Sequence, residues 1–546
     1  MSGPRGLLAA AAAMGALVAA SPALAIDLSL RPSFLPPVDG SAPTNALALA
    51  AQGRELIVAV TRDERAVAIL RTHRARRLGE GIWLVAGTES AAALRRLHGI
   101  GALRYAHPNG RNRPSIARAV QGDPLDPAPW WLPQIGANRV TPPAGGFPLT
   151  IIDDGIDTSH PEFASRRVMY LNQNYLIPQE DYHGTMMSSA AAAPLDGVGM
   201  AGLYPQANLR LADTGEGNCA DVLAAVEAAV SAGPSVVNMS WGFSPPSCLA
   251  MYDQILRGLA SGSMFVAATG NMRLHFSPPG SPAIWPHVLT VGSTGLAGQV
   301  SYFSNEGRGI DLAAPGESIF AATPIFFEAS GYASLEGTSF SAALVSAAGA
   351  WIATRRRLHV TQLSELLRAS ARDVGLPSWD PDTGFGILDL PAALRRPLPP
   401  VDPLEPNDDV NQIRAGGVFK DAAAPLTYPG RGRVSVRARL DRSEDPADVY
   451  RVFVPAGTVV RFRLAPSSNV DLEVFRAHAS SCYHQNRRRA KQAGLIGGSY
   501  APGRTPDSFT VRSRRRTGEY VYACLFKPRD LRHTAAYSLA LTTARR

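Results

Sequence analysis

Three features are missing from this sequence of 546 residues. It has no Gly-x-Ser-x-Gly motif, which argues against a lipase or esterase that presents its serine on that turn. After residue 25 it has no apolar run of the roughly 18 residues that a membrane helix requires, so we expect no membrane span. Charged residues make up only 18% of the chain against 45% hydrophobic residues, a balance that excludes disorder and favours folded domains.

The N-terminus has the pattern of a secretory signal. Arg5 precedes an apolar stretch at 7–20, and small residues at 23–25 form a cleavage site. No cysteine follows the apolar stretch, so we expect no lipid attachment there. We therefore expect a protein that is secreted to the extracellular space or the periplasm.

Cysteine is scarce, with four in the whole chain. In an oxidising compartment they are expected to form disulfides. Chain order favours Cys219 with Cys248 and Cys482 with Cys524, one bond in each of two domains. Four cysteines allow three connectivities, so the other pairings stay open.

The formal net charge of +9 is unevenly distributed. Residues 26–120 carry a net +7, residues 121–400 a net −10 and residues 401–546 a net +11. The basic isoelectric point is therefore a property of the two flanks. An acidic middle between basic flanks indicates docking within the chain rather than binding to nucleic acid.

The length favours about three domains, and composition places their boundaries. Prolines interrupt the segment before residue 54, and a second proline-rich stretch begins at Arg396-Pro397. The last segment has short alternating strands typical of an all-β sandwich. The predicted organisation is a signal peptide at 1–25, an N-terminal segment at 26–120 with a small α+β module at about 54–108, an α/β domain at 121–396, a linker at 397–409 and a β-sandwich at 410–546.

The middle domain alternates apolar strands with helices, which predicts a parallel sheet buried on both faces. Strands are predicted at 149–152, 236–240, 264–268 and 288–292. Asp153, Ser240 and Asn271 lie at or just past strand ends. Because chemistry in such sheets gathers at the carboxyl ends of strands, these residues are site candidates.

A Gly-Thr turn leads into Ser339 and a helix of small residues over 339–350. A serine hydroxyl is a weak nucleophile that needs an adjacent base, and the base needs a group to hold it. His183 begins another helix of small residues, and Asp153 ends a strand 30 residues earlier. Taken singly, these residues also fit an N-cap serine, a core histidine and a turn aspartate.

Six blocks, taken together and in this order, resemble the subtilisin-like serine peptidases, or subtilases. They are residues 151–157, 183–185, 238–242, 267–271, 313–316 and 337–339. The order aspartate, histidine, serine is that of subtilisin. The resemblance implies a subtilisin-like parallel-sheet catalytic domain and a serine endopeptidase.

The resemblance also implies a role for each residue of the triad. Asp153 would orient His183, which would act as general base and then as general acid, and Ser339 would be the nucleophile. The side-chain amide of Asn271 and the backbone N–H of Ser339 would hold the oxyanion. No cofactor is needed for this chemistry.

Protein or peptide substrates would bind as an added strand. Ser240, Trp241 and Gly242 would pair with the substrate backbone. Gly242 and Gly280 would leave the primary specificity pocket open, with Trp241 lining it. We expect broad cleavage of proteins after large apolar residues.

The sequence departs from the family pattern at a few positions. Residues 186–189 read Met-Met-Ser-Ser where the family has His-Val-Ala-Gly, and Ala343 replaces a proline. Asp154 is a second carboxylate beside Asp153, but only Asp153 lies two residues before Gly155 as the family requires. These changes concern supporting positions rather than the triad.

The flanks fit a precursor. Residues 26–120 resemble the family's propeptide, an inhibitor and folding aid removed by self-cleavage, and this basic segment suits the acidic enzyme domain. Residues 404–408 and the β-rich segment after them resemble the appended domain of secreted bacterial peptidases. The resemblance also makes a structural calcium ion plausible, with Glu162 and Asp196 as candidate ligands. Alternatively, both residues are ordinary solvated carboxylates.

A rival hypothesis belongs to another class. The chain would cleave only itself, or nothing, and would act as a binding module through its basic last domain. Arginine clusters at 487–489 and 514–516 motivate this hypothesis, because they could hold an anionic surface or polysaccharide. A solvated basic face is an equally good explanation of them.

Overall fold

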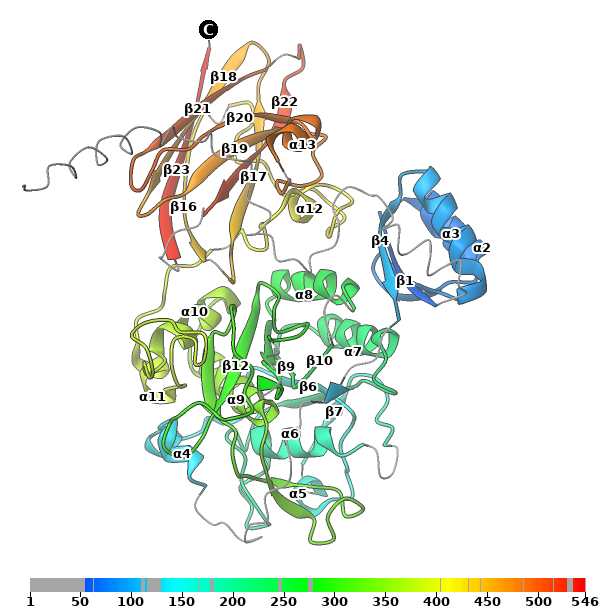
Figure 1. Cartoon of the computed structure of the whole chain (residues 1–546), viewed down its shortest axis with the longest axis vertical. Coiled ribbons are helices and arrows are strands. Elements are labelled where there is room, and N and C mark those ends of the chain that lie inside the picture. The colour runs from blue at the N-terminus through cyan, green and yellow to red at the C-terminus, as the bar shows by residue number, and fades with distance from the viewer. Residues whose placement is uncertain are drawn as a thin grey trace, which may run out of the picture.

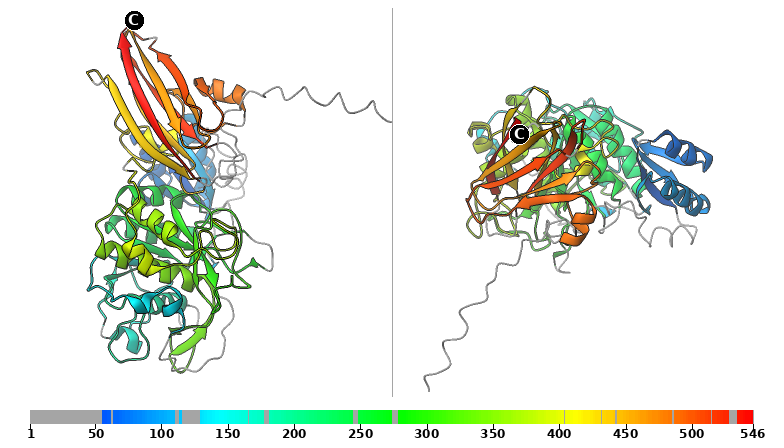
Figure 2. Two further views of the ribbon diagram at one scale, coloured as in Figure 1. Left: turned by 90° about the vertical axis from the view of Figure 1, so that its left-hand side faces the viewer. Right: turned by 90° about the horizontal axis from the view of Figure 1, so that it is seen from above.

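The computed structural model describes residues 55–545 with gaps. The gaps are 62, 110–112, 115–128, 165, 177–180, 244–247, 274–277, 403, 431, 442, 485, 514 and 528–533. The predicted signal peptide, the linker at 26–53 and the predicted start of the enzyme domain at 121–128 lie outside the described residues. Figure 1 shows a small N-terminal module, a central α/β domain and a C-terminal sandwich. Seen from above in Figure 2, the module lies to one side of the other two.

The N-terminal module is an antiparallel sheet in the order β2-β3-β1-β4 with two helices. Its elements are β1 (Leu56–Val60), α2 (Glu64–Thr72), β2 (Arg76–Gly79), β3 (Ile82–Val85), α3 (Gly87–Gly99) and β4 (Leu103–Pro108). Side chains of β1 alternate between two cores. Leu56, Val58 and Val60 pack with α2 and α3, whereas Ile57 and Ala59 pack against helices of the central domain. The sheet is therefore the surface through which the module docks.

The central domain is built on a parallel sheet of seven strands in the order β13-β12-β11-β9-β6-β8-β7, which confirms the predicted fold class. The strands are β6 (Leu149–Asp153), β7 (Met169–Tyr170), β8 (Leu209–Asp213), β9 (Val236–Met239), β11 (Met264–Ala268), β12 (Val288–Thr294) and β13 (Leu312–Pro315). Shorter elements are β5 (Arg113–Pro114), α4 (Trp131–Gln134), a 3-10 turn at Ala137–Arg139, α5 (Pro161–Ala164), β10 (Trp241–Gly242), β14 (Ile319–Ala322) and β15 (Tyr332–Leu335).

Helices cover both faces of this sheet (Figure 1). One face packs with α6 (His183–Ala192) and α9 (Thr338–Arg355), and the other with α7 (Cys219–Ser231) and α8 (Ala250–Ala260). Residues Thr338 to Ile352 of α9 are all buried, so the run of small residues lets this helix lie in the middle of the core. Further helices are α10 (Val360–Ser370) and α11 (Leu390–Arg395).

The C-terminal part is a sandwich of two antiparallel sheets, as predicted. Their orders are β16-β23-β18-β21 and β17-β22-β19-β20. The elements are α12 (Val410–Ile413), β16 (Arg433–Asp441), β17 (Ala447–Val454), β18 (Thr458–Pro466), β19 (Asp471–Arg476), α13 (Arg487–Gln492), β20 (Leu495–Ser499), β21 (Asp507–Arg512), β22 (Glu519–Phe526) and β23 (Thr534–Arg545). Alternate residues of these strands face a shared apolar core.

Two disulfides pair Cys219 with Cys248 and Cys482 with Cys524, which confirms the pairing that chain order favoured. The first joins the start of α7 to the segment before α8, and the second lies within the sandwich. Among the described residues, no helix combines the length and the apolar character needed to cross a membrane.

Candidate active site

The carboxyl ends of β6 and β9 lie side by side at the middle of the sheet. The chain runs from β6 to β8 on one side and later returns to β9 on the other, so the strand order reverses between them. Asp153 is the last residue of β6, Ser240 follows β9, and Asn271 lies beyond β11. Ligands of open parallel sheets bind at such a reversal, and Asp153 and Ser240 lie at it, with Asn271 beyond the next strand.

Asp153 and His183 form a buried hydrogen-bonded pair. His183 Nδ1 donates to Asp153 Oδ1 over 2.7 Å, and the two residues are 1% and 3% exposed. Burial lowers the pKa of His183, but the charge of Asp153 and the hydrogen bond outweigh it, so the net pKa lies above its ordinary value. In the described part of the chain, His183 Nε2 has no hydrogen-bond partner. The ring is fixed through one nitrogen and available at the other.

Asp154 contacts the same helix through its backbone. Its carboxylate accepts hydrogen bonds from the N–H groups of Tyr182, His183 and Gly184 at 3.2, 3.1 and 2.5 Å. Burial, and then the charge of Asp153, raise the pKa of Asp154 to about 7. Asp154 thus caps α6, whose own N-cap residue supplies no side-chain hydrogen bond. Of the two neighbouring carboxylates, only Asp153 reaches the imidazole.

Ser339 is the second residue of α9 and is buried. Its hydroxyl donates to the carbonyl oxygen of Ser240 over 2.9 Å, and the Ser240 hydroxyl donates back to the carbonyl of Ser339 over the same distance. Asn238 Nδ2 donates to the Ser240 hydroxyl at 2.9 Å. The start of α9 is therefore tied to the carboxyl end of β9, and α9 also packs against α6, which begins at His183.

Asn271 is held at the start of α9 by Thr338, a residue to which the sequence analysis assigned no role. Asn271 Oδ1 accepts hydrogen bonds from the backbone N–H of Thr338 at 3.0 Å and from its hydroxyl at 2.8 Å. Gly270 N–H donates to the Thr338 hydroxyl at 3.1 Å. Asn271 Nδ2 is buried and has no partner within the described residues. The only signal for Thr338 was its place directly before Ser339.

The predicted substrate strand is paired with another strand of the chain. Trp241 and Gly242 form β10, which pairs in antiparallel register with the backbone of Arg113 and Pro114 in β5. The backbone of β10 therefore accepts an added strand from the segment that follows the N-terminal module.

Gly242 and Gly280 lie on two segments that approach each other closely. The neighbouring residues Phe243 and Ser281 exchange backbone hydrogen bonds of 2.7 and 3.0 Å. A Cβ atom on Gly280 would come within 2.6 Å of the Phe243 carbonyl, so only glycine fits there.

Trp241, which was predicted to line the specificity pocket, is deeply buried. Its side chain is in the core: the residue is 2% exposed and Nε1 donates to the carbonyl of Ile152 over 2.6 Å. Its ring packs edge to face against Phe243, with centroids 6.0 Å apart. The indole thereby ties β10 to β6, the strand that ends in Asp153.

The two predicted calcium ligands do not make a metal group. Glu162 Oε1 accepts hydrogen bonds from Met200 N–H at 2.7 Å and from the Tyr332 hydroxyl at 2.9 Å. Within the described residues, neither Glu162 nor Asp196 belongs to a set of three or more side chains placed to share an ion. One oxygen of Glu162 is thus held by hydrogen bonds, and the other, Oε2, is buried without a partner within the described residues.

Known proteins resemble this chain in the sequence of its central domain and in its fold. The model of the subtilase family matches residues 145–386. Subtilisin of Bacillus pumilus is 30% identical over 254 residues, which cover 45% of this chain and 90% of that protein. Subtilisin E of Bacillus subtilis (strain 168) is also 30% identical over 254 residues, but the match spans 65% of its length.

A solved structure extends the likeness in fold beyond the central domain. Fervidolysin from Fervidobacterium pennivorans, described as a keratinolytic enzyme related to subtilisin, superposes with a TM-score of 0.54 at 17% identity. The match covers 84% of this chain and 85% of fervidolysin. At this identity, the likeness concerns the fold alone.

Proposed function

Because this chain belongs to the subtilase family of serine peptidases, we propose that it is an endopeptidase that hydrolyses peptide bonds in proteins through Asp153, His183 and Ser339. The observation that supports this most directly is the buried hydrogen bond between Asp153 and His183. It holds the imidazole in one orientation and leaves Nε2 without a partner in the described chain. This is the arrangement that a general base requires.

The first half of the reaction would form an acyl-enzyme. The Ser339 hydroxyl turns from the carbonyl of Ser240 toward His183 and gives its proton to Nε2 as Oγ attacks the substrate carbonyl. Asp153 stabilises the imidazolium. Asn271 Nδ2 and the backbone N–H of Ser339, at the positive end of α9, donate to the oxyanion. His183 then protonates the leaving amine, and the peptide bond breaks.

The second half would release the acid. Water enters the space left by the amine, His183 removes its proton, and the hydroxide attacks the acyl carbonyl. The second tetrahedral intermediate collapses as His183 returns the proton to Ser339 Oγ. The cycle uses no cofactor, because every proton passes through the imidazole.

We propose that substrates bind as an antiparallel strand on β10. The pairing of β5 with Trp241 and Gly242 supports this, since it occupies backbone groups that a substrate would use. The same pairing supports a precursor in which residues 26–120 block the site until self-cleavage. We further propose that the precursor is secreted, in keeping with its two disulfides.

A serine-reactive fluorophosphonate tests the proposal. We expect it to label the processed wild-type protein once, at Ser339, and to stop cleavage of a casein substrate. Ser339→Ala should be neither labelled nor active, whereas Ser341→Ala, two residues along the same helix, should keep the label. If the wild-type protein is folded and remains unlabelled, the binding-module hypothesis takes precedence.

A further inference from the structure

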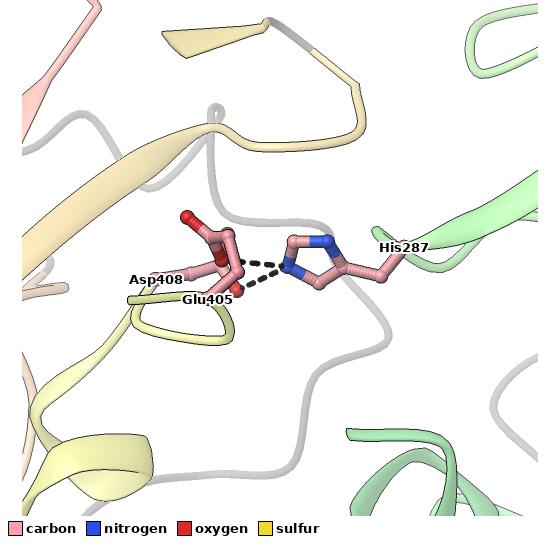
Figure 3. Close-up of side chains that lie close together, drawn as sticks. All are labelled: His287, Glu405 and Asp408. Atoms are coloured by element: carbon pink, nitrogen blue, oxygen red, sulfur yellow. Dashed lines mark hydrogen bonds and ion pairs between the residues drawn. The ribbon is translucent and has the colours of Figure 1, made fainter. Parts of the chain in front are cut away.

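Five acidic side chains gather where the linker passes between the central domain and the sandwich. We call Asp402, Glu405, Asp408, Asp445 and Asp448 the junction cluster. The first three belong to the linker, and the other two lie just before and within β17. Figure 3 shows that His287, from the segment before β12, points at Glu405 and Asp408. Three parts of the molecule therefore meet at this cluster.

Four members of the cluster present oxygens to one another. One carboxylate oxygen from each of Asp402, Glu405, Asp445 and Asp448 lies within 4.8 Å of all the others. Oxygens that bind one calcium ion at 2.3–2.6 Å lie at such separations. Asp448 is fully buried and Glu405 is 9% exposed. Negative charges that are this close together and shielded from water repel each other strongly unless a cation lies between them.

Each of three carboxylates is held by one oxygen and leaves the other without a partner. Asp448 Oδ2 accepts from the Tyr537 hydroxyl at 2.5 Å, Glu405 Oε2 from Asn407 N–H at 3.2 Å, and Asp402 Oδ1 from Leu404 N–H at 3.2 Å.

The second oxygens of these three residues are buried and make no hydrogen bond within the described chain, and the same holds for Asp445 Oδ1. Asp408 Oδ1 and Asn407 Oδ1 are two further such oxygens, on residues that are 3% and 1% exposed, and the amide nitrogen of Asn407 is also buried without a partner. Buried polar atoms normally find partners, so a set of unpartnered acceptors indicates a missing cation.

The described residues supply little positive charge to the cluster. Within them, His287 is the side chain that forms ion pairs with it, through Nε2 to Asp408 at 2.8 Å and to Glu405 at 3.5 Å. A buried group of carboxylates with so little positive charge beside it favours a bound cation.

We propose that the junction cluster is a calcium site, with Asp402, Glu405, Asp445 and Asp448 as its charged ligands. A donor set made of oxygens alone suits calcium better than zinc, which prefers nitrogen and sulfur. Asn407 lies in the same segment, its side chain interacts with Asp448, and its Oδ1 is a further candidate ligand. A cavity of about 480 Å³ bordered by His287, Asp402, Glu405 and Asp445 gives the ion a path from solvent.

The ion joins the sandwich to the central domain. The linker already pairs with β17, because Val449 N–H donates to the carbonyl of Asn407 over 2.7 Å. His287 reaches the site from the central domain through Asp408 and Glu405, and so acts as a positioning residue that orients ligands from outside. Calcium therefore fixes the linker and the angle between the two domains.

Calorimetric titration of the full chain with CaCl2 after chelation tests the proposal. The Ser339→Ala background keeps the chain intact, so the result does not depend on peptidase activity. We expect one calcium ion per chain, a rise in Tm of several degrees at saturating calcium, and slower amide hydrogen exchange in the linker at 397–409. Magnesium at the same concentration should do markedly less, because it demands a tighter octahedron of ligands.

Variants locate the ion. Asp448→Asn should weaken calcium binding about tenfold or more, and His287→Gln, which keeps every oxygen ligand, about 10- to 100-fold. Asp471→Asn is the matched control: Asp471 is a buried carboxylate of the same sandwich outside the cluster, with its pKa raised to about 7 by burial. The control should bind calcium as its parent does.

Three outcomes overturn the proposal. They are no calcium binding by the folded parent at millimolar calcium, equal stabilisation by magnesium and calcium, or calcium binding that survives both Asp448→Asn and His287→Gln. If Asp448→Asn does not fold, His287→Gln and the parent titration decide alone.

Discussion

The contact between Asp153 and His183 is predicted to determine how activity depends on pH. His183 must be neutral to accept a proton, so activity falls as pH drops through its raised pKa and is present above it. Asp153→Asn removes the charge that raises this pKa. We expect the acid limb of kcat/KM to move to lower pH, while kcat falls by about four orders of magnitude, as for triad aspartates elsewhere, including subtilisin itself.

The pH profile of a peptide substrate measures both effects. Asp157→Asn serves as the control, because Asp157 is a nearby carboxylate that contacts Ser159 instead of the imidazole. An acid limb that stays in place in Asp153→Asn would contradict the assigned role.

Asn271 is expected to act in the transition state more than in substrate binding. Asn271→Ala should lower kcat by about 10²–10³ with little change in KM, a magnitude measured on subtilisin, a relative of this chain. Thr338→Val should cause a smaller loss of kcat, since it removes the hydroxyl bond that holds Asn271, and Thr338→Ser should restore it. A change confined to KM would remove Asn271 from the oxyanion site.

At the scale of elements, Asp154 shows how the start of α6 is fixed. Its carboxylate accepts three backbone N–H groups at the end of the helix that carries His183. Asp154→Ala should lower the free energy of unfolding by about 1 kcal/mol and also reduce kcat, because His183 loses its fixed backbone. Urea unfolding in the Ser339→Ala background and peptidase assays in the wild type measure the two effects.

Asp389 provides a matched control for this cap. It caps α11, where it accepts a hydrogen bond from Ala392 N–H at 2.8 Å. Asp389→Ala should cost similar stability and leave kcat unchanged. Equal losses of kcat in the two variants would mean that the cap of α6 has no special link to the imidazole.

Elements with a strong local signal were predictable from the sequence. The apolar strands of the central sheet and the two helices of small residues follow directly from their patterns. The departures from the family in these helices also have a physical reason: Met186, Met187 and Ala343 are fully buried, so they fill core space.

Elements that depend on tertiary contacts were not predictable. β2 begins with two exposed arginines and is ordered by Leu78, which packs in the core with α7 and α8. Trp241 was expected to line a pocket from its place in a strand that resembles the family's substrate-binding strand, and its indole lies in the core with a hydrogen bond to the carbonyl of Ile152. No local pattern contains either contact.

At the scale of the whole molecule, the N-terminal module is attached to the central domain by a buried ion pair. Arg104 of β4 and Asp253 of α8 lie 2.7 Å apart with side chains 8% and 5% exposed. Removing one partner of such a pair typically costs 3–5 kcal/mol. Arg104→Ala should therefore weaken docking at least about 100-fold and shorten the lag between cleavage of the precursor and full activity.

Arg65→Ala is the control for this prediction. Arg65 forms an exposed ion pair with Asp63 inside the module, with side chains 73% and 28% exposed, and exposed pairs contribute little. Its lag should match that of the wild type. An unchanged lag in Arg104→Ala would show that the ion pair does not govern release.

The arrangement of the domains could not be predicted from the sequence, although their existence could. Composition separates the proline-rich linker from its neighbours, but docking depends on residues far apart in the chain. Arg368 of α10, for example, pairs with Asp311 at 3.0 Å and with Asp441 of β16 at 2.7 Å. The junction cluster was missed for the same reason, since each of its carboxylates alone resembles a surface residue.

The central claim is that Ser339 cleaves peptide bonds, the first of them in its own chain. The most direct test is to express residues 26–546 as wild type and as Ser339→Ala, and to follow their intact masses over time. We predict that only the wild-type chain loses a fragment that ends near residues 105–125. If both chains remain whole, or both are cut alike, the claim is contradicted.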